Sequence, residues 1–149
     1  MITADLIIDS LPASSKKQAL ELMASRAAGL FFGNPDQVLN ALIERERLGS
    51  TGIGSGVAIP HIKLPGLKRM YGLLARLETP VDFGAIDGRP VDLVFMLLAP
   101  VDSKTTQHLM ALAQISRFLK DVNTCDQLRA CRGEGLAAIL AEWLKRQAA

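Results

Sequence analysis

The sequence predicts an α/β fold in which helices flank a single β-sheet. Segments with apolar residues at helical spacing alternate along the chain with short apolar runs that are typical of strands. The 149 residues include 49% hydrophobic and 21% charged residues, which is ordinary for a globular protein and sufficient for one buried core. No internal repeat, low-complexity segment or long linker divides the chain, so residues 1–149 are predicted to form one domain.

Two helices are predicted in the first third of the chain. Ser15 with Gln18 three residues later has the form of a capping box, and an apolar stripe follows, so one helix should run from about 15 to 29. Asn34-Pro35 then offers an N-cap residue followed by proline at the first helical position. Gly49 is placed to end this second helix.

Three strands are predicted in the middle of the chain. Residues 57–59 form a short apolar run, and residues 72–77 form a second strand candidate. Thr79-Pro80 and Asp87-Gly88 mark turns in the connection to the third strand. Residues 91–99 are apolar on both faces, so this strand should lie at the centre of the sheet.

The last third of the chain is predicted to be helical. Ser103 or Thr105 could cap a third helix, whose apolar stripe follows directly. A short helical piece is expected near residues 126–131, and a last helix is expected over residues 136–145. Helices and strands are therefore interspersed along the chain, as the α/β prediction requires.

Composition argues against several kinds of site and partner. A net charge of +2, with no basic tract interleaved with aromatic residues, gives no support for nucleic-acid binding. A metal site needs more ligands than the two histidines supply, and Asp82, Asp87 and Asp92 have no motif spacing that would complete one. We therefore expect no metal, no cofactor and no nucleic-acid partner.

The sequence also indicates a cytoplasmic location. The N-terminus has no basic region, and Asp5 and Asp9 interrupt its apolar residues, which argues against a signal peptide. The most apolar run, residues 93–99, is too short to span a membrane. Cys125 and Cys131 fit no metal spacing and no disulfide framework, which favours a reducing compartment.

A glycine-rich segment, TGIGSGVAIPH at residues 51–61, ends in one of the two histidines. A dinucleotide fingerprint would need a strand before the glycines and a helix after them, and Ser55-Gly56-Val57 breaks its spacing. A phosphate-binding P-loop would need Gly-Lys-Ser or Gly-Lys-Thr, which is absent, and the Gly-x-Ser-x-Gly spacing of a serine hydrolase is also wrong. Alternate glycines do permit positive φ angles and the close approach of a backbone or a partner surface, although a plain irregular loop is the alternative.

His61 is the first candidate for chemistry. It is predicted to lie just past a strand end, after Pro60, where α/β sheets usually place their sites. A neutral imidazole is a good nucleophile at neutral pH and can carry a phosphoryl group on one ring nitrogen. The alternative is a histidine that makes a hydrogen bond and has no catalytic role.

Two further residues could assist His61. His108 is predicted in the first or second turn of the third helix, where the helix dipole favours a neutral imidazole that can donate to an anionic oxygen. Arg45, near the end of the second helix, could hold phosphate oxygens in its planar fork. Each also has a structural alternative, which is completion of the inner stripe for His108 and a helix-end cation for Arg45. Lys63, Lys68 and Arg69 raise the positive potential after His61.

The segment from Arg45 to His61, RERLGSTGIGSGVAIPH, resembles the signature of a known family. This family is the enzyme IIA proteins of the fructose/mannitol type in the phosphoenolpyruvate-dependent phosphotransferase system (PTS). The resemblance continues through residues 77–83, residues 86–93 and His108 to the C-terminal helix, so residues 1–149 resemble one EIIA type 2 domain. Among the branches of the family, the chain looks most similar to the nitrogen-regulatory (PtsN-type) enzyme IIA.

The resemblance implies a fold and a set of site residues. The implied fold is a mixed sheet of about five strands with helices on both faces. His61 would accept a phosphoryl group on Nε2 from an HPr-like phosphocarrier (NPr), Arg45 would hold the phosphoryl oxygens, and His108 would support both by hydrogen bonding. Ile62 departs from the small residue that is usual after the phosphorylated histidine, so the resemblance does not determine the shape of the docking surface or the preference for partners.

The implied function is a regulatory phosphorelay in which the phosphorylation state of His61 controls partner proteins. In related proteins such partners include components of potassium transport and its sensor kinases. One alternative is a sugar-specific (fructose/mannitol) enzyme IIA that donates to a separate IIB, which would use the same chemistry. A second alternative is a module that binds an anion without covalent chemistry.

Overall fold

In a computed structural model of the chain, which describes residues 2–148, one strand lies at the centre of a six-stranded mixed sheet. Five helices accompany this sheet within the described residues, so the predicted α/β fold is confirmed, with one strand more than expected. The elements follow one another as β1 (Leu6–Leu11), α1 (Lys16–Ala28), α2 (Pro35–Arg47), β2 (Gly52–Gly54), β3 (Val57–Ala58), β4 (His61–Leu64), β5 (Tyr71–Val81), β6 (Val91–Pro100), α3 (Thr105–Lys120), α4 (Val122–Ala130) and α5 (Gly135–Ala148).

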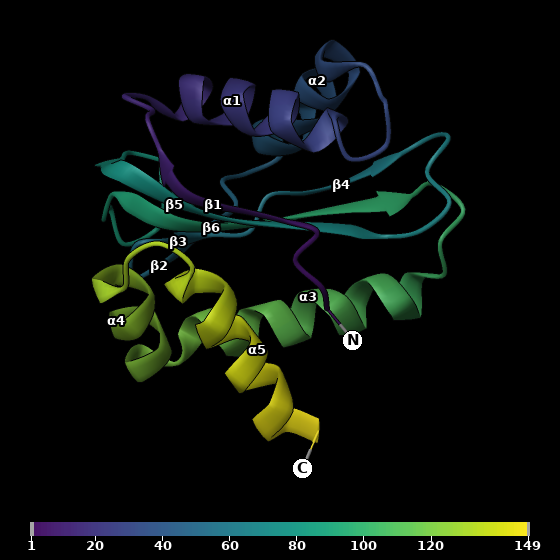
Figure 1. Ribbon diagram of the computed structural model, residues 1–149. Coiled ribbons are helices and arrows are strands. Elements are labelled where there is room, and N and C mark those ends of the chain that lie inside the picture. The colour runs from purple at the N-terminus through teal and green to yellow at the C-terminus, as the bar shows by residue number, and fades with distance from the viewer. Residues whose placement is uncertain (1, 149) are drawn as a thin grey trace.

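The sheet order is β1-β5-β6-β3-β2, and β4 pairs with β6 beyond the end of β3. β5 and β6 are antiparallel, whereas β3 and β4 both run parallel to β6. Helices α1 and α2 cover one face of this sheet, and α3, α4 and α5 cover the other (Figure 1). The edge strand β4 therefore lies where both helical layers can reach it.

Strand β6 separates two hydrophobic cores. Because successive side chains of a strand point to opposite faces, a strand that is apolar throughout can serve a core on each side. The prediction that residues 91–99 form the central strand is thus confirmed. Its buried residues alternate between the core under α1 and α2 (Val94, Met96, Leu98) and the core under α3 to α5 (Leu93, Phe95, Leu97).

The predicted starts of α1 and α2 are confirmed by their caps. The Ser15 hydroxyl accepts from the Gln18 backbone N–H at 3.1 Å, whereas the Gln18 side chain accepts from the Ser14 N–H at 2.7 Å rather than from that of Ser15. The Asn34 side chain accepts from the Asp36 N–H at 2.8 Å, with Pro35 as the first helical residue. These side chains satisfy backbone donors that the helix itself leaves unpaired.

Other predicted boundaries are wrong. Helix α3 has Lys104 as its N-cap residue with no side-chain cap, so neither Ser103 nor Thr105 has the predicted capping role. Helix α4 begins at Val122, four residues before the expected start, because the Asp121 side chain caps it at the Thr124 N–H. No helix in the part of the chain that the structure describes is long and apolar enough to cross a membrane.

Candidate active site

Three side chains from three elements meet at one open hollow of about 530 Å³. Arg45 comes from the last turn of α2, His61 is the first residue of β4, and His108 lies near the N-terminus of α3. The two helices belong to opposite layers, and the edge strand β4 brings them to a common point. The structure thus brings together the three residues that the sequence singled out. The full lining is Ala41, Glu44, Arg45, Leu48, His61, Ile62, Lys63 and His108.

The ring of His61 is fixed by a backbone carbonyl. Its Nδ1 lies 2.8 Å from the carbonyl oxygen of Ile59, and a carbonyl can only accept a hydrogen bond. Nδ1 must therefore carry the proton, which leaves Nε2 with its lone pair. The Nε–H of Arg45 donates to that Nε2 at 3.4 Å, which agrees with this tautomer.

Arg45 is held at both ends of its guanidinium group. One Nη1–H donates to the Gly49 carbonyl at 3.0 Å, just beyond the end of α2, while Nε–H reaches the His61 ring. A guanidinium has five N–H donors in one plane. Two of them are used here within the described residues, so the others are available to an anion in the hollow.

His108 faces His61 across the hollow. The two ring centroids are 5.8 Å apart and the ring planes are inclined by 54°. The Nε2 atom of His108 is buried and has no hydrogen-bond partner among residues 2–148. Burial, and then the charges of His61 and Lys63, lower the pKa of His108, so this imidazole stays neutral at pH 7. A neutral imidazole whose Nε2–H has no partner can donate a hydrogen bond to one oxygen of a bound group.

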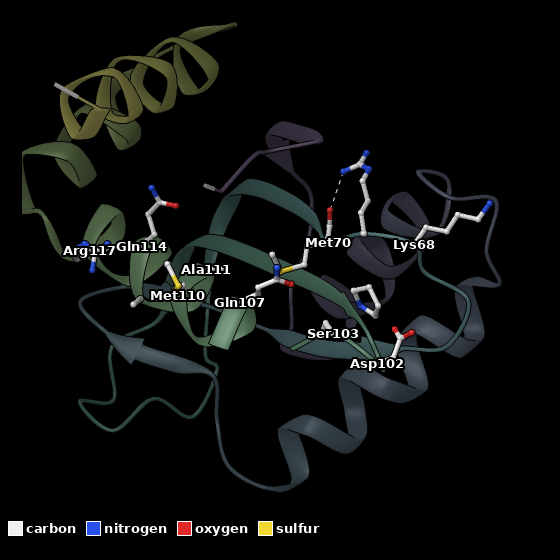
Figure 2. Close-up of a pocket in the computed structure, with 12 residues that line it drawn as sticks. Lys68, Met70, Asp102, Ser103, Gln107, Met110, Ala111, Gln114 and Arg117 are labelled. Carbon is white, nitrogen blue, oxygen red and sulfur yellow. Dashed lines mark hydrogen bonds between the residues drawn. The ribbon is translucent and has the colours of Figure 1, made fainter. Parts of the chain in front are cut away.

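The positive charges after His61 divide between two places. Lys63 lines the hollow with His61 and His108. This is expected because His61 and Lys63 are two residues apart on β4 and so point to the same face of the strand. Lys68 and Arg69 line a different cavity of about 910 Å³, which α3 also lines (Figure 2). Arg69 is bound there to Asp5 at 3.0 Å. Of these three cations, only Lys63 therefore lines the hollow beside His61.

His61 lies just past the end of β3, as the sequence predicted, and it also begins a further strand that was not predicted. Pro60 interrupts the ladder for only a short stretch, and its carbonyl still accepts from the Leu97 N–H at 2.9 Å. His61 then begins β4 and pairs with Leu97 on the central strand. Because the backbone on one side of His61 belongs to the sheet, the imidazole is attached to a rigid element rather than to a loop.

The glycine-rich segment forms a hairpin rather than an irregular loop. Strands β2 and β3 are joined by Ser55 and Gly56, which both have positive φ angles, of 58° and 79°. A Cβ atom on Gly56 would lie 2.7 Å from Nη2 of Arg129, whose guanidinium is paired with Asp92 at 2.9 Å. The predicted close approach exists, but at Gly56 it is made by the chain itself and not by a partner.

Ile62 does not change the outer surface of the site by its bulk. Its side chain is only 6% exposed and belongs to the core under α1 and α2. Alternation along β4 explains this, because Ile62 points to the face opposite His61 and Lys63. Ile62 therefore contributes its bulk mainly to the core, although it also belongs to the lining of the hollow.

Metal binding finds no support among the described residues, which contain no group of three or more histidine, cysteine, aspartate or glutamate side chains arranged to hold an ion. The free thiols of Cys125 and Cys131 lie in and around the α3 to α5 core. The ionisable groups that line the hollow are two imidazoles, a guanidinium, an ammonium group and the carboxylate of Glu44.

Comparison with known proteins decides the family. The model of the family described as "Phosphoenolpyruvate-dependent sugar phosphotransferase system, EIIA 2" matches residues 1–143. The chain belongs to this EIIA family. The nitrogen regulatory protein of Bradyrhizobium diazoefficiens is 46% identical over 142 residues, which cover 95% of this chain and 92% of that protein.

Two further relatives support the same branch of the EIIA family. The nitrogen regulatory protein of Escherichia coli K12 is 46% identical over 121 residues, covering 80% of this chain and 74% of that protein. The crystal structure of the nitrogen regulatory protein IIA-Ntr from Neisseria meningitidis has a TM-score of 0.84 at 34% identity and covers 91% of this chain and 92% of that one. The resemblance to nitrogen-regulatory EIIA proteins is thereby confirmed.

Two groups that contact the His61 ring or the segment before it were not predicted from the sequence. The carbonyl of Ile59 carries no side-chain signal, so its effect on the His61 ring could not be anticipated. Glu46 lies between Arg45 and Arg47 and belongs to no catalytic motif in the sequence, although its carboxylate is largely buried. A carboxylate five residues before a threonine at a helix end was the available signal.

Proposed function

We propose that this EIIA protein is a regulatory phosphorelay in which His61 is the phosphoryl carrier. Nε2 of His61 accepts a phosphoryl group from a phosphohistidine of an HPr-like carrier such as NPr, and the state of His61 controls partner proteins in the cytoplasm. The observation that carries this proposal is the bond from Nδ1 to the Ile59 carbonyl. It supports Nε2 as the free nucleophile, in the same hollow as Arg45 and His108.

The proposed transfer is an in-line displacement at phosphorus. The lone pair of Nε2 forms the new N–P bond while the bond from phosphorus to the carrier nitrogen breaks, and that electron pair returns to the carrier imidazole. The His61 ring keeps its Nδ1 proton and gains positive charge as the N–P bond forms. The Ile59 carbonyl, already 2.8 Å away, then accepts a charge-assisted hydrogen bond that stabilises the phosphorylated ring.

Arg45 changes partner during the proposed reaction. Its Nε–H donates to the lone pair of Nε2 at rest, at 3.4 Å, and this long contact must give way when phosphorus arrives. The guanidinium then binds phosphoryl oxygens, where its planar fork offsets the charge of the transferred group. The resting contact also keeps the guanidinium within reach of the reacting atom.

His108 and Lys63 complete the proposed surroundings of the phosphoryl group. The Nε2 atom of His108 has no hydrogen-bond partner among the described residues, so the neutral imidazole donates from Nε2–H to a phosphoryl oxygen without adding charge. Lys63 supplies a second cation at the open side of the hollow. The open shape supports transfer between proteins, because the donor histidine must approach Nε2 directly.

Phosphoryl transfer from a charged carrier tests the proposal. The full chain is incubated with phosphoenolpyruvate, enzyme I and an HPr-like carrier, and its intact mass is measured. We expect a gain of one phosphoryl group, which is absent in His61→Ala and present in the surface variant Lys145→Ala. No gain from a carrier that is itself shown to be phosphorylated would contradict the proposal.

The same experiment distinguishes the alternatives. A protein that only binds anions would show phosphate binding without a covalent mass gain. A sugar-specific EIIA would gain the phosphoryl group and then lose it to a separate IIB protein, which can be added in a second step. Retention of the phosphoryl group in the presence of fructose- and mannitol-type IIB proteins favours the regulatory function.

A further inference from the structure

We propose that Glu46 is a positioning residue that sets both Arg45 and the ring of His61 for phosphoryl transfer. This inference rests on the proposed function of His61. Glu46 does not line the hollow, and its side chain is only 8% exposed. A buried carboxylate is costly unless hydrogen bonds and a cation satisfy it, so its partners indicate what it holds in place.

The carboxylate of Glu46 is bound by the segment that follows α2. Its Oε2 accepts from the Thr51 backbone N–H at 3.0 Å, and its Oε1 accepts from the Thr51 hydroxyl. Lys16 at the start of α1 places its ammonium group 3.4 Å from Oε2. Glu46 thereby fastens the last turn of α2 to the beginning of β2 and to α1, and the hydroxyl of Thr51 is buried with it.

The bonds of Thr51 continue to His61. The Thr51 carbonyl accepts from the Ile59 N–H at 2.9 Å, and the Ile59 carbonyl accepts from Nδ1 of His61 at 2.8 Å. The position of Thr51 thus fixes the position of the carbonyl that selects the His61 tautomer. Glu46 holds Thr51 by both its backbone and its side chain, and so reaches the imidazole through two residues.

Glu46 also determines the position of Arg45, its neighbour on α2. Adjacent residues on a helix are rotated by about 100° around its axis, so Glu46 can face α1 and Thr51 while Arg45 faces His61. When the carboxylate is fixed, the rotation of the last turn is fixed, and with it the origin of the Arg45 side chain. The Gly49 carbonyl that accepts from Arg45 Nη1 at 3.0 Å lies in the same fastened segment.

The carboxylate of Glu46 therefore determines the position of the Arg45 guanidinium relative to the His61 imidazole. Lys16 supports this arrangement, because its ammonium group also donates to the Phe83 carbonyl at 3.1 Å. Ser50 donates to the same carbonyl at 2.6 Å. The start of α1 and the segment between α2 and β2 thus share one acceptor, the Phe83 carbonyl. Misplacement of reacting groups by about 1 Å can cost a hundredfold in rate.

The kinetic test uses Glu46→Gln, which keeps the size of the side chain and removes its charge. We expect the rate constant of transfer to His61 to fall about 10- to 100-fold, with the KM for the carrier unchanged, because the docking surface is not altered. Thr51→Val should act in the same direction, and Thr51→Ser, which keeps the hydroxyl, should restore the rate. The threonine variants keep the test valid if Glu46→Gln folds poorly.

A matched control separates positioning from stability. Asp92 is another half-buried carboxylate paired with a cation, Arg129, but it lies on β6 well before Leu97, the register partner of His61. Asp92→Asn should lower the melting temperature and leave the transfer rate unchanged. If Glu46→Gln behaves like Asp92→Asn, with reduced stability and a normal rate, Glu46 is structural only and the inference is overturned.

A second measurement needs no phosphoryl donor. ¹⁵N NMR of the imidazole reports which ring nitrogen of His61 carries the proton. We expect the Nδ1–H form in the parent protein and in Asp92→Asn, and a mixture of both tautomers in Glu46→Gln and Thr51→Val. An unchanged His61 tautomer in both variants would overturn the inference, even if the parent protein proves unable to accept a phosphoryl group.

Discussion

The carbonyl of Ile59 determines which ring nitrogen of His61 carries the proton and which keeps its lone pair. The sequence indicated His61 as a nucleophile because a neutral imidazole follows an extended, proline-restricted segment, and the family resemblance named Nε2. Residue types alone could not identify the tautomer, since a backbone group selects it. They also could not show that Arg45 and His108 meet at His61, because the three residues lie on separate elements that only tertiary folding brings together. The roles of all three in transfer stay predictions.

Replacement of Arg45 should affect transfer far more than stability. We expect Arg45→Ala to slow phosphoryl transfer about 100-fold or more, because a charged donor at the reacting group is lost. Arg45→Lys should recover part of the rate, since it keeps the charge and loses the planar fork. Rapid-quench measurement of phosphoryl uptake gives the rates. A parental rate in Arg45→Ala would show that the guanidinium has no part in transfer.

The lowered pKa of His108 predicts a pH dependence of stability. Burial, then the charges of His61 and Lys63, hold the folded-state pKa below the ordinary value of 6.5. The unfolded chain therefore binds more protons just below that pH, and the free energy of unfolding falls as the pH drops through this window. Relative to His108→Gln, the parent protein should lose stability between about pH 7 and about pH 5.

Thermal melts of the two proteins across this range check the prediction. As the pH is lowered, the melting temperature of the parent protein should fall relative to that of His108→Gln. A difference that stays constant with pH would mean that the proton affinity of His108 is the same in the folded and unfolded chains.

At the level of helices and strands, the local sequence predicted helix caps more accurately than short strands. The side chains of Ser15 and Asn34 cap α1 and α2 as the sequence predicted, because capping is a local interaction. Strands β1, β2 and β4 were not predicted. The last two have only three and four residues, and their pairing partners lie elsewhere in the chain. The start of α3 carries no side-chain cap, so sequence reasoning chose the wrong residues there.

The β2–β3 hairpin should tolerate no side chain at Gly56. Its φ angle is 79°, and a Cβ atom would meet the Arg129 guanidinium at 2.7 Å. We expect Gly56→Ala to lower the free energy of unfolding by roughly 1–2 kcal/mol from the backbone conformation alone, measured by urea denaturation. Because the turn contacts Arg129 and not His61, the transfer rate of the folded variant should equal that of the parent. A slowed rate with unchanged stability would instead indicate that a partner docks on the turn.

At the scale of the whole molecule, β6 joins two cores that face opposite helical layers. The doubly apolar run 91–99 made this strand predictable as the centre of the sheet. The order of its neighbours was not predictable from local patterns, since pairing between distant segments leaves no local periodicity. The site depends on both layers, because Arg45 comes from α2 and His108 from α3. Loss of either layer should therefore disable it.

Phe118 and Trp143 allow two tests of the layer formed by α3, α4 and α5. It is fully buried in the α3 to α5 core, and its ring packs edge-on against Trp143 at 5.2 Å. We expect Phe118→Ala to cost about 3–5 kcal/mol in the free energy of unfolding.

Trp143 is the only tryptophan, so its fluorescence reports on this layer, while far-UV circular dichroism reports on both. The two transitions should coincide in the parent protein, and separate midpoints would show that the layers unfold independently.

The nitrogen that carries the phosphoryl group provides the most direct test of this account. The protein is labelled with ¹⁵N at its histidines, phosphorylated by an HPr-like carrier, and examined by ¹⁵N and ³¹P NMR. We predict one N–P bond, at Nε2 of His61, with the proton retained on Nδ1 beside the Ile59 carbonyl. A phosphoryl group on Nδ1 of His61, or on His108, would contradict it.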